Sequence, residues 1–228
     1  KTEAFASPLL AEGAFSVTDP DGRRVVFGLA KEAENAQGLP GRLQHFVCAT
    51  ERLPQTLEFY RGLGMVESDR VLEGEAIAAV FLRSDPEHHS FAAFRAPQSR
   101  ADHHCYETNG WLDIRDWADR MASLRIPLFW GPGRHGPGNN LFFMIEDPDG
   151  HKVEFSAELE LMPRAMPSRT WPHEQRTLNL WGSAWMRSWS SVGLSRGRLY
   201  TAFDTKRCEP IGGVGLSPRV WIGPHPWP

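Results

Sequence analysis

The side chains in this sequence best suited to chemistry are two histidines and a glutamate. His45 and His104 lie in two segments of strand-like alternation, and Glu154 lies in a third. Side chains alternate between the faces of a strand, so residues from three neighbouring strands of a curved sheet can converge on its concave face. Two imidazoles and one carboxylate leave the opposite side of a metal open, as in non-haem Fe(II) oxygenases. Zinc is the alternative, because Zn²⁺ accepts the same donors.

Five of the nine histidines fall between residues 88 and 135. A single histidine is more often a core or surface residue than a ligand, because its burial preference is only intermediate. Imidazole nevertheless has an unperturbed pKa near 6.5, which suits proton transfer at neutral pH. We therefore expect acid-base groups beside the metal among these histidines.

The elements that must position these residues alternate between strand and helix patterns twice. The first set consists of residues 43–48, 53–63, 76–83 and 89–95. The second set consists of residues 103–107, 111–124, 141–145 and 152–155, with a Gly/Pro loop at 131–140. This order predicts an α+β fold, in which paired βαβββ modules form a curved, mostly antiparallel half-barrel sheet around the metal site.

A short motif occurs twice, at residues 19–28 and 147–156. Both copies begin Asp-Pro-Asp-Gly and continue into an alternating apolar strand, which is typical of a tight turn between two strands. We therefore expect residues 1–38 to contain the end of an earlier, non-catalytic βαβββ domain, whose remainder is absent, and a linker.

Composition excludes several classes of protein. The chain has 228 residues, with 25 Lys and Arg against 28 Asp and Glu and a net charge of −3. Because no basic block is present, we expect neither nucleic-acid nor membrane binding. No apolar run approaches a membrane span and no signal-peptide pattern is present, which favours a cytoplasmic protein. The three widely spaced cysteines indicate neither a disulfide framework nor a CxxC metal site.

Several motifs together resemble the type I extradiol ring-cleavage dioxygenases of the vicinal oxygen chelate superfamily, in particular the catechol and homoprotocatechuate 2,3-dioxygenases. They are GRLQHF, FYRGLGM, the His103-His104 doublet, GPGRHG and DPDGHKVE, at residues 41–46, 59–65, 103–104, 131–136 and 147–154. The resemblance covers residues 41–187. It implies a catalytic domain at residues 39–160 and a pocket-covering segment at 161–187, followed by an extension of unknown role at 188–228.

The resemblance implies an oxidoreductase of aromatic hydrocarbon catabolism that uses Fe(II), or Mn(II) as the alternative ion. Such an enzyme cleaves a catechol next to its hydroxyl groups and inserts both atoms of dioxygen. We also expect a homo-oligomer. Two other functions remain open on the same fold: another metal-dependent enzyme, such as a glyoxalase-like isomerase or lyase, and a non-catalytic small-molecule binding module.

Carried over by position, the resemblance makes His45, His104 and Glu154 the metal ligands. His103, one residue before His104, would then point to the opposite face of the strand. His89 matches the pocket histidine that moves a proton, with His88 as its competitor. Strand alternation predicts that only one of this pair looks into the pocket while the other looks out, so removing His88 should have little effect.

His135 matches the histidine of the family's GPGRHG loop. At two other positions of the substrate pocket, this sequence differs from the family. Met144 stands where the family has a tyrosine that hydrogen-bonds the substrate, and methionine cannot donate that bond. Tyr106 is a conceivable substitute donor. Trp130 stands where carboxylate-binding relatives have an arginine, which favours an apolar or multi-ring substrate, with core packing of Trp130 as the alternative.

Overall fold

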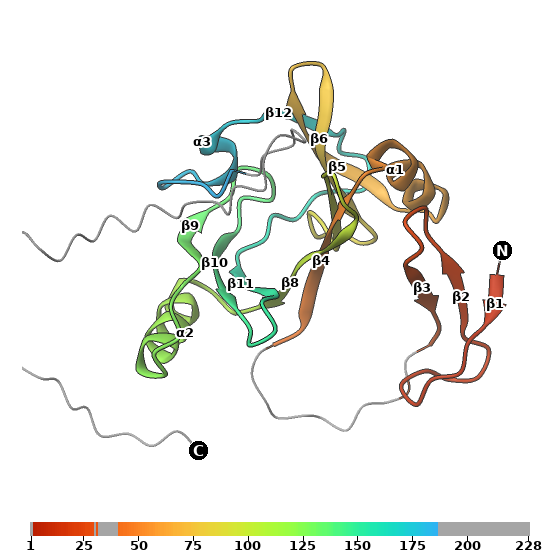
Figure 1. Cartoon of the computed structure of the whole chain (residues 1–228), viewed down its shortest axis with the longest axis horizontal. Helices are drawn as coiled ribbons and strands as arrows, with labels where there is room; N and C mark the ends of the chain where they lie inside the picture. The colour runs from red at the N-terminus through yellow and green to blue at the C-terminus, as the bar shows by residue number, and fades with distance from the viewer. Residues whose placement is uncertain (1, 30, 32–40, 187–228) are drawn as a thin grey trace, which may run out of the picture. The chain divides into compact units, whose positions relative to one another are not determined.

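The computed structural model describes residues 2–29, 31 and 41–186 (Figure 1). The extension expected at residues 188–228 lies outside the described residues. None of the described helices combines the length and the apolar character needed to cross a membrane.

Two βαβββ modules share a nine-stranded sheet. The first module contains β4 (Leu43–Thr50), α1 (Leu53–Gly62), β5 (Val66–Glu73), β6 (Ala76–Arg83) and β7 (Phe91–Arg95). The second contains β8 (Arg100–Glu107), α2 (Trp111–Ser123), β9 (Trp130–Arg134), β10 (Leu141–Glu146) and β11 (Lys152–Ala157). The strand order is β12-β5-β6-β7-β4-β8-β11-β10-β9, so the modules mirror each other across the antiparallel β4-β8 pair. The predicted fold class, a curved and mostly antiparallel sheet of paired modules, is confirmed.

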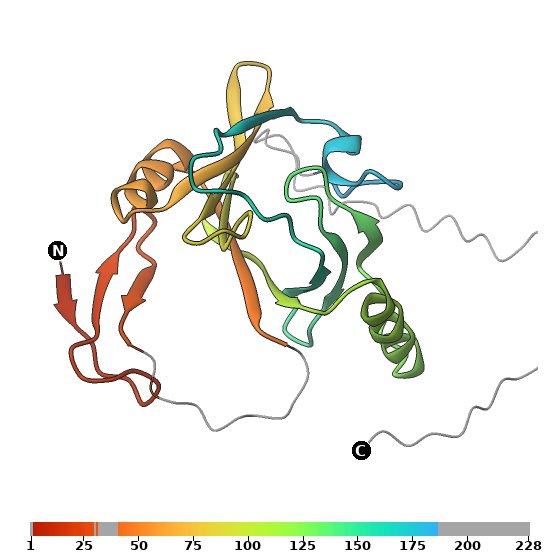
Figure 2. The same cartoon turned by 180° about the vertical axis from the view of Figure 1, so that it is seen from behind.

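The helices pack on one face of the sheet and leave the other face to the predicted site. Leu53 and Leu57 of α1 pack with Val80 and Leu82 of β6. Ile114 and Met121 of α2 pack with residues that include Phe143 of β10 and Phe155 of β11. Figures 1 and 2 show both helices outside the curve of the sheet. The neighbours of these core residues along each strand, such as Met144 and Glu154, therefore point to the inner face.

Residues that follow β11 cross the open side of the sheet. β12 (Arg169–Pro172) pairs in parallel with β5 at one edge. α3 (Gln175–Leu178) lies near the opposite edge, where Gly136 N donates to Thr177 O and Leu180 N donates to Arg134 O. The segment therefore connects the outer strands of both modules across the inner face.

β1 (Thr2–Ala4), β2 (Phe15–Thr18) and β3 (Arg24–Phe27) form a separate small sheet. The two Asp-Pro-Asp-Gly turns have the same geometry: Gly22 and Gly150 both have φ of 84°. Asp19 Oδ1 accepts from the amides two and four residues later, and Asp147 Oδ1 does the same. The repeated sequence therefore folds into a repeated turn; that residues 1–38 are the remnant of an earlier domain stays a prediction.

Within the two modules, the sequence patterns missed two strands. β5 was not identified, and β9 lies at the start of the segment expected to be a Gly/Pro loop. Gly and Pro are unfavourable within central strands, but β9 is an edge strand that pairs only with β10. Its Gly131 has a positive φ of 91°, and a side chain there would collide with the backbone of Phe142 and Phe143.

Candidate metal centre and substrate pocket

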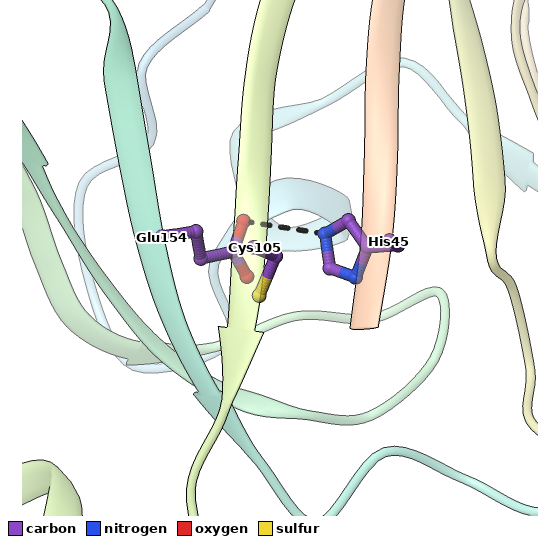
Figure 3. A group of neighbouring side chains, drawn as sticks. All are labelled: His45, Cys105 and Glu154. Carbon is purple, nitrogen blue, oxygen red and sulfur yellow. Dashed lines mark ion pairs between the residues drawn. The ribbon is translucent and has the colours of Figure 1, made fainter. Parts of the chain in front are cut away.

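His45, Cys105 and Glu154 share one face of three adjacent strands. Cys105 of β8 is the cross-strand partner of His45 on β4 and also of Glu154 on β11. Figure 3 shows His45 and Glu154 pointing toward each other, and His45 Nε2 lies 3.6 Å from Glu154 Oε2. Potential ligand atoms of all three residues lie within 4.8 Å of one another. The register thus brings together two of the three predicted ligands.

His103 supplies the second imidazole of the cluster. It precedes Cys105 by two residues and so lies on the same face of β8, with Nε2 3.2 Å from Glu154 Oε2. Its Nδ1 lies 2.7 Å from Asp102 Oδ1. A carboxylate only accepts hydrogen bonds, so Asp102 fixes the proton on Nδ1 and leaves Nε2 to face the cluster. Carboxylates orient metal-binding histidines in this way.

The structure therefore contradicts the prediction that His104 joins His45 and Glu154. His104 lies on the opposite face of β8, is only partly buried, and its ring contacts Tyr106 at 5.5 Å between centroids. The physical reason is strand parity, because His45 pairs with Cys105 rather than with His104 and the β4-β8 register contains irregularities. Tyr106 shares the face of His104, so it does not take the place of the missing pocket tyrosine.

Cys105 is a weaker candidate donor than His103, although the sequence reasoning overlooked it at this site. Burial and the nearby carboxylate of Glu154 raise the pKa of the Cys105 thiol well above its usual value. A metal ligand must be the thiolate. Burial opposes protonation of His103, but Asp102 and Glu154 outweigh it and raise its pKa; a metal would need to displace only the Nε2 proton, and Nδ1 would stay bound to Asp102. His45, His103 and Glu154 are therefore the donor set that best fits a metal.

The electrostatics of the cluster suit a cation. Burial opposes ionisation of Glu154, but the surrounding imidazoles of His103, His135 and His45 outweigh it and hold the pKa of Glu154 well below its usual value. Burial lowers the pKa of His45, so this ring is neutral. His45 Nδ1 is buried and has no hydrogen-bond partner among the described residues. A buried carboxylate faced by imidazole nitrogens is a site that a divalent cation would complete.

Two more histidines, His89 and His135, line the cavity beside this cluster. The rings of His89 and His45 lie 4.3 Å apart between centroids. His135 Nδ1 donates to Leu178 O at 2.6 Å, so Nε2 remains and lies 3.7 Å from Glu154 Oε1. The ring of His135 also stacks on Phe142 at 3.7 Å. His135 is therefore held in one orientation over the inner face.

The rest of the cavity wall is mostly apolar. Met144 and Trp130, which are cross-strand partners, both line it. Trp130 is only partly buried, and its Nε1 donates to Ser183 O. No Lys or Arg is among the described lining residues, which also include Val47, Phe81, Phe94, Pro137, Thr177 and Leu178.

His88 does not look out to solvent, contrary to the prediction for the partner of His89. Its side chain is 0% exposed, and Nε2 lies 2.9 Å from Asp69 Oδ2. The pair precedes β7, which starts at Phe91, so strand alternation does not govern it.

Residues 42–155 match the Glyoxalase/Bleomycin resistance protein/Dioxygenase superfamily. Metapyrocatechase 2 of Cupriavidus necator is 31% identical over 73% of this chain and 48% of its own length. The 3-methylcatechol 2,3-dioxygenase of Pseudomonas putida is 29% identical over 63% of this chain and 55% of its own length.

Solved structures agree with these matches. The homoprotocatechuate 2,3-dioxygenase of Arthrobacter globiformis superimposes with a TM-score of 0.73 at 25% identity, over 84% of this chain and 64% of that chain. The fold and the family match together define a member of the Glyoxalase/Bleomycin resistance protein/Dioxygenase superfamily, to which this chain belongs. Within it, the relatives named here are dioxygenases of catechol-type compounds, and the chain spans about half the length of these curated relatives.

Proposed function

We propose that the protein is an extradiol dioxygenase that cleaves the ring of a catechol with dioxygen. The observation that carries the proposal is the convergence of His45, His103 and Glu154 in an apolar cavity that also holds His89 and His135. The named relatives support the same activity. They do not favour the alternatives of an isomerase, a lyase or a non-catalytic binding module.

The donor set supports a metal cofactor, for which we propose Fe(II), with Mn(II) as the alternative. His45, His103 and Glu154 would hold the ion and leave its other positions open. The bound metal would supply a common centre for the catechol oxygens and dioxygen.

The remaining side chains of the cavity provide proton transfer and shape. His89 is the proposed acid-base group, because its ring lies against His45 at the metal end of the cavity. His135 points Nε2 toward Glu154 and is positioned to hydrogen-bond bound substrate. The segment around Thr177 and Leu178, which lines the cavity, would exclude bulk water from it.

The cavity wall indicates an uncharged substrate. Glu154 is the only acidic residue of the described lining, and no described lining residue is a Lys or Arg that could pair with a carboxylate. An anionic substituent would lose its hydration there without gaining a partner. We therefore propose a catechol with apolar, uncharged substituents, which Trp130 and Met144 would contact.

Anaerobic loading with Fe(II), addition of a panel of catechols and then admission of air would test the proposal. The expected result is a yellow ring-fission product from uncharged catechols, measured by its visible spectrum. A Glu154→Ala protein provides the matched control and should give no product. Absence of product from every catechol by a folded, iron-loaded wild-type protein would contradict the proposal. Sedimentation of the same sample tests the proposed homo-oligomer.

A further inference from the structure

A chain of polar side chains leads from His89 through the protein interior. His89 Nδ1 lies 2.8 Å from His88 Nδ1, and His88 Nε2 lies 2.9 Å from Asp69 Oδ2. The side chains of His88 and Asp69 are both 0% exposed. Water therefore does not compete for these contacts, and each buried polar group depends on its neighbour.

Asp69 is anchored as a carboxylate. Arg169 donates Nε to Oδ1 at 2.8 Å and Nη2 to Oδ2 at 3.1 Å, and Trp171 Nε1 donates to Oδ2 at 2.8 Å. Arg169 is itself held by both oxygens of Glu160. Burial opposes ionisation of Asp69, but hydrogen bonds from His88 and Arg169 outweigh it and lower its pKa.

The packing leaves His88 little freedom to turn away from these partners. Its backbone amide donates to Glu160 O, and Glu160 N donates to Gly138 O. A side chain at Gly138 would approach His88 Nδ1 to 3.2 Å. The GPGRHG loop that carries His135 thus continues into the wall behind His88.

The positions of the protons follow from Asp69. A carboxylate can only accept, so His88 Nε2 donates to it, and a neutral His88 then has its lone pair on Nδ1. With His88 neutral, the hydrogen bond between the histidines runs from His89 Nδ1–H to His88 Nδ1. The lone pair of His89 is left on Nε2.

We propose that His88 and Asp69 are positioning residues, which fix His89 in the Nδ1–H tautomer so that the lone pair on its Nε2 is free to accept a hydrogen bond in the cavity. The aspartate of a serine-protease triad fixes its histidine by the same physics. The catalytic consequence rests on the proposed function: His89 Nε2 would accept a hydrogen bond from a catechol O–H group and so orient it for the reaction. The tautomer itself does not depend on that function.

The tautomer of His89 can be measured directly. Long-range ¹⁵N–¹H spectra of the full chain with labelled histidine, free of metal, should show the proton of His89 on Nδ1. His88→Phe removes both nitrogens and should let His89 populate the Nε2–H form. His88→Asn should restore the wild-type pattern, because an amide oxygen can accept where Nδ1 did. The exposed His151→Asn is the control and should leave it unchanged. A wild-type His89 with its proton on Nε2 would overturn the proposal without any variant.

Turnover tests the catalytic consequence separately. In the iron-loaded enzyme, His88→Phe should lower kcat about tenfold or more, part of the 10²- to 10⁴-fold effect of an acid-base group, while iron content and KM stay unchanged. His88→Asn should recover part of this loss, which a purely structural role would not predict. An active wild type whose kcat survives His88→Phe would refute the catalytic role. If the wild type cleaves no catechol, the proposed function fails, and the tautomer measurement still decides the assignment for His88.

Discussion

His103 Nε2 lies 3.2 Å from Glu154 Oε2, whereas the adjacent His104 lies on the opposite face of the same strand. The two residues have the same side chain and adjacent places in the sequence, and only the pairing register of β8 separates their environments. Asp102 adds to this difference, because its carboxylate holds His103 Nδ1 at 2.7 Å.

The first prediction follows from this register. His103→Ala, like His45→Ala, should lose most of its bound iron, because each variant removes one of three donors. His104→Ala is the matched control and should keep a full equivalent. Iron content after gel filtration, with thermal unfolding measured beside it, makes the comparison. Loss of iron from the His104 variant alone would mean that the register is wrong.

The second prediction concerns His89. His89→Asn should bind iron and catechol as the wild type does, yet turn over roughly a hundredfold more slowly, because an acid-base group is lost. Single-turnover mixing of the anaerobic enzyme-catechol complex with oxygenated buffer measures that step. His151→Asn should behave as the wild type. Equal rates for the His89 variant and the wild type would exclude His89 from proton transfer.

The third prediction is a pH dependence of stability from Asp69. Its pKa in the folded protein is lowered from 3.8, so its contribution to the free energy of unfolding is present above pH 3.8. The contribution is lost as the pH falls through the lower, folded-state pKa. Asp69→Asn should therefore be less stable than the wild type by about 2 kcal/mol at neutral pH, and the difference should shrink in acid.

Urea unfolding of the metal-free proteins across this pH range tests the prediction. Asp119→Asn, which changes an exposed carboxylate on α2, serves as the control and should differ little from the wild type at any pH. A stability difference for Asp69→Asn that stays constant into strong acid would contradict the assigned ion pairs.

The fourth prediction concerns Met144, which is 1% exposed and pairs with Glu154 across β10 and β11. Met144→Tyr should be tolerated and should raise kcat on simple catechols, because a phenol can donate a hydrogen bond that a thioether cannot. Met144→Phe supplies the ring without the hydroxyl and should show no gain. A similar gain in both variants would assign the effect to shape.

The fifth prediction concerns Trp130. Trp130→Arg should lower KM for a catechol with a carboxylate side chain by about tenfold, because an arginine pairs with carboxylates through two hydrogen bonds. Its KM for uncharged catechols should rise as apolar contact is lost. Trp130→Phe keeps an aromatic ring and should not improve the carboxylated substrate. Steady-state kinetics on both substrate types decides between these outcomes.

The sequence by itself predicted most of the fold. Strand and helix periodicity marked both modules, since burial on one face imposes a repeat on the chain. The Asp-Pro-Asp-Gly turns were readable because local hydrogen bonds and one positive φ define them. His45, Glu154, His89 and His135 were predicted for the site, and the structure places all four at the cavity.

Only the tertiary structure decided which of the two neighbours His103 and His104 lies at the site. The face of the sheet on which each β8 side chain lies depends on the register of β8 with β4 and β11. A shift of one residue would put His104 at the site in place of His103. The role proposed for His88 was hidden from the sequence as well, because its partner Asp69 lies on β5 and Arg169, which binds Asp69, lies on β12. Contacts between residues distant in the chain leave no periodic signal in the sequence, so they emerge only when the elements pack together.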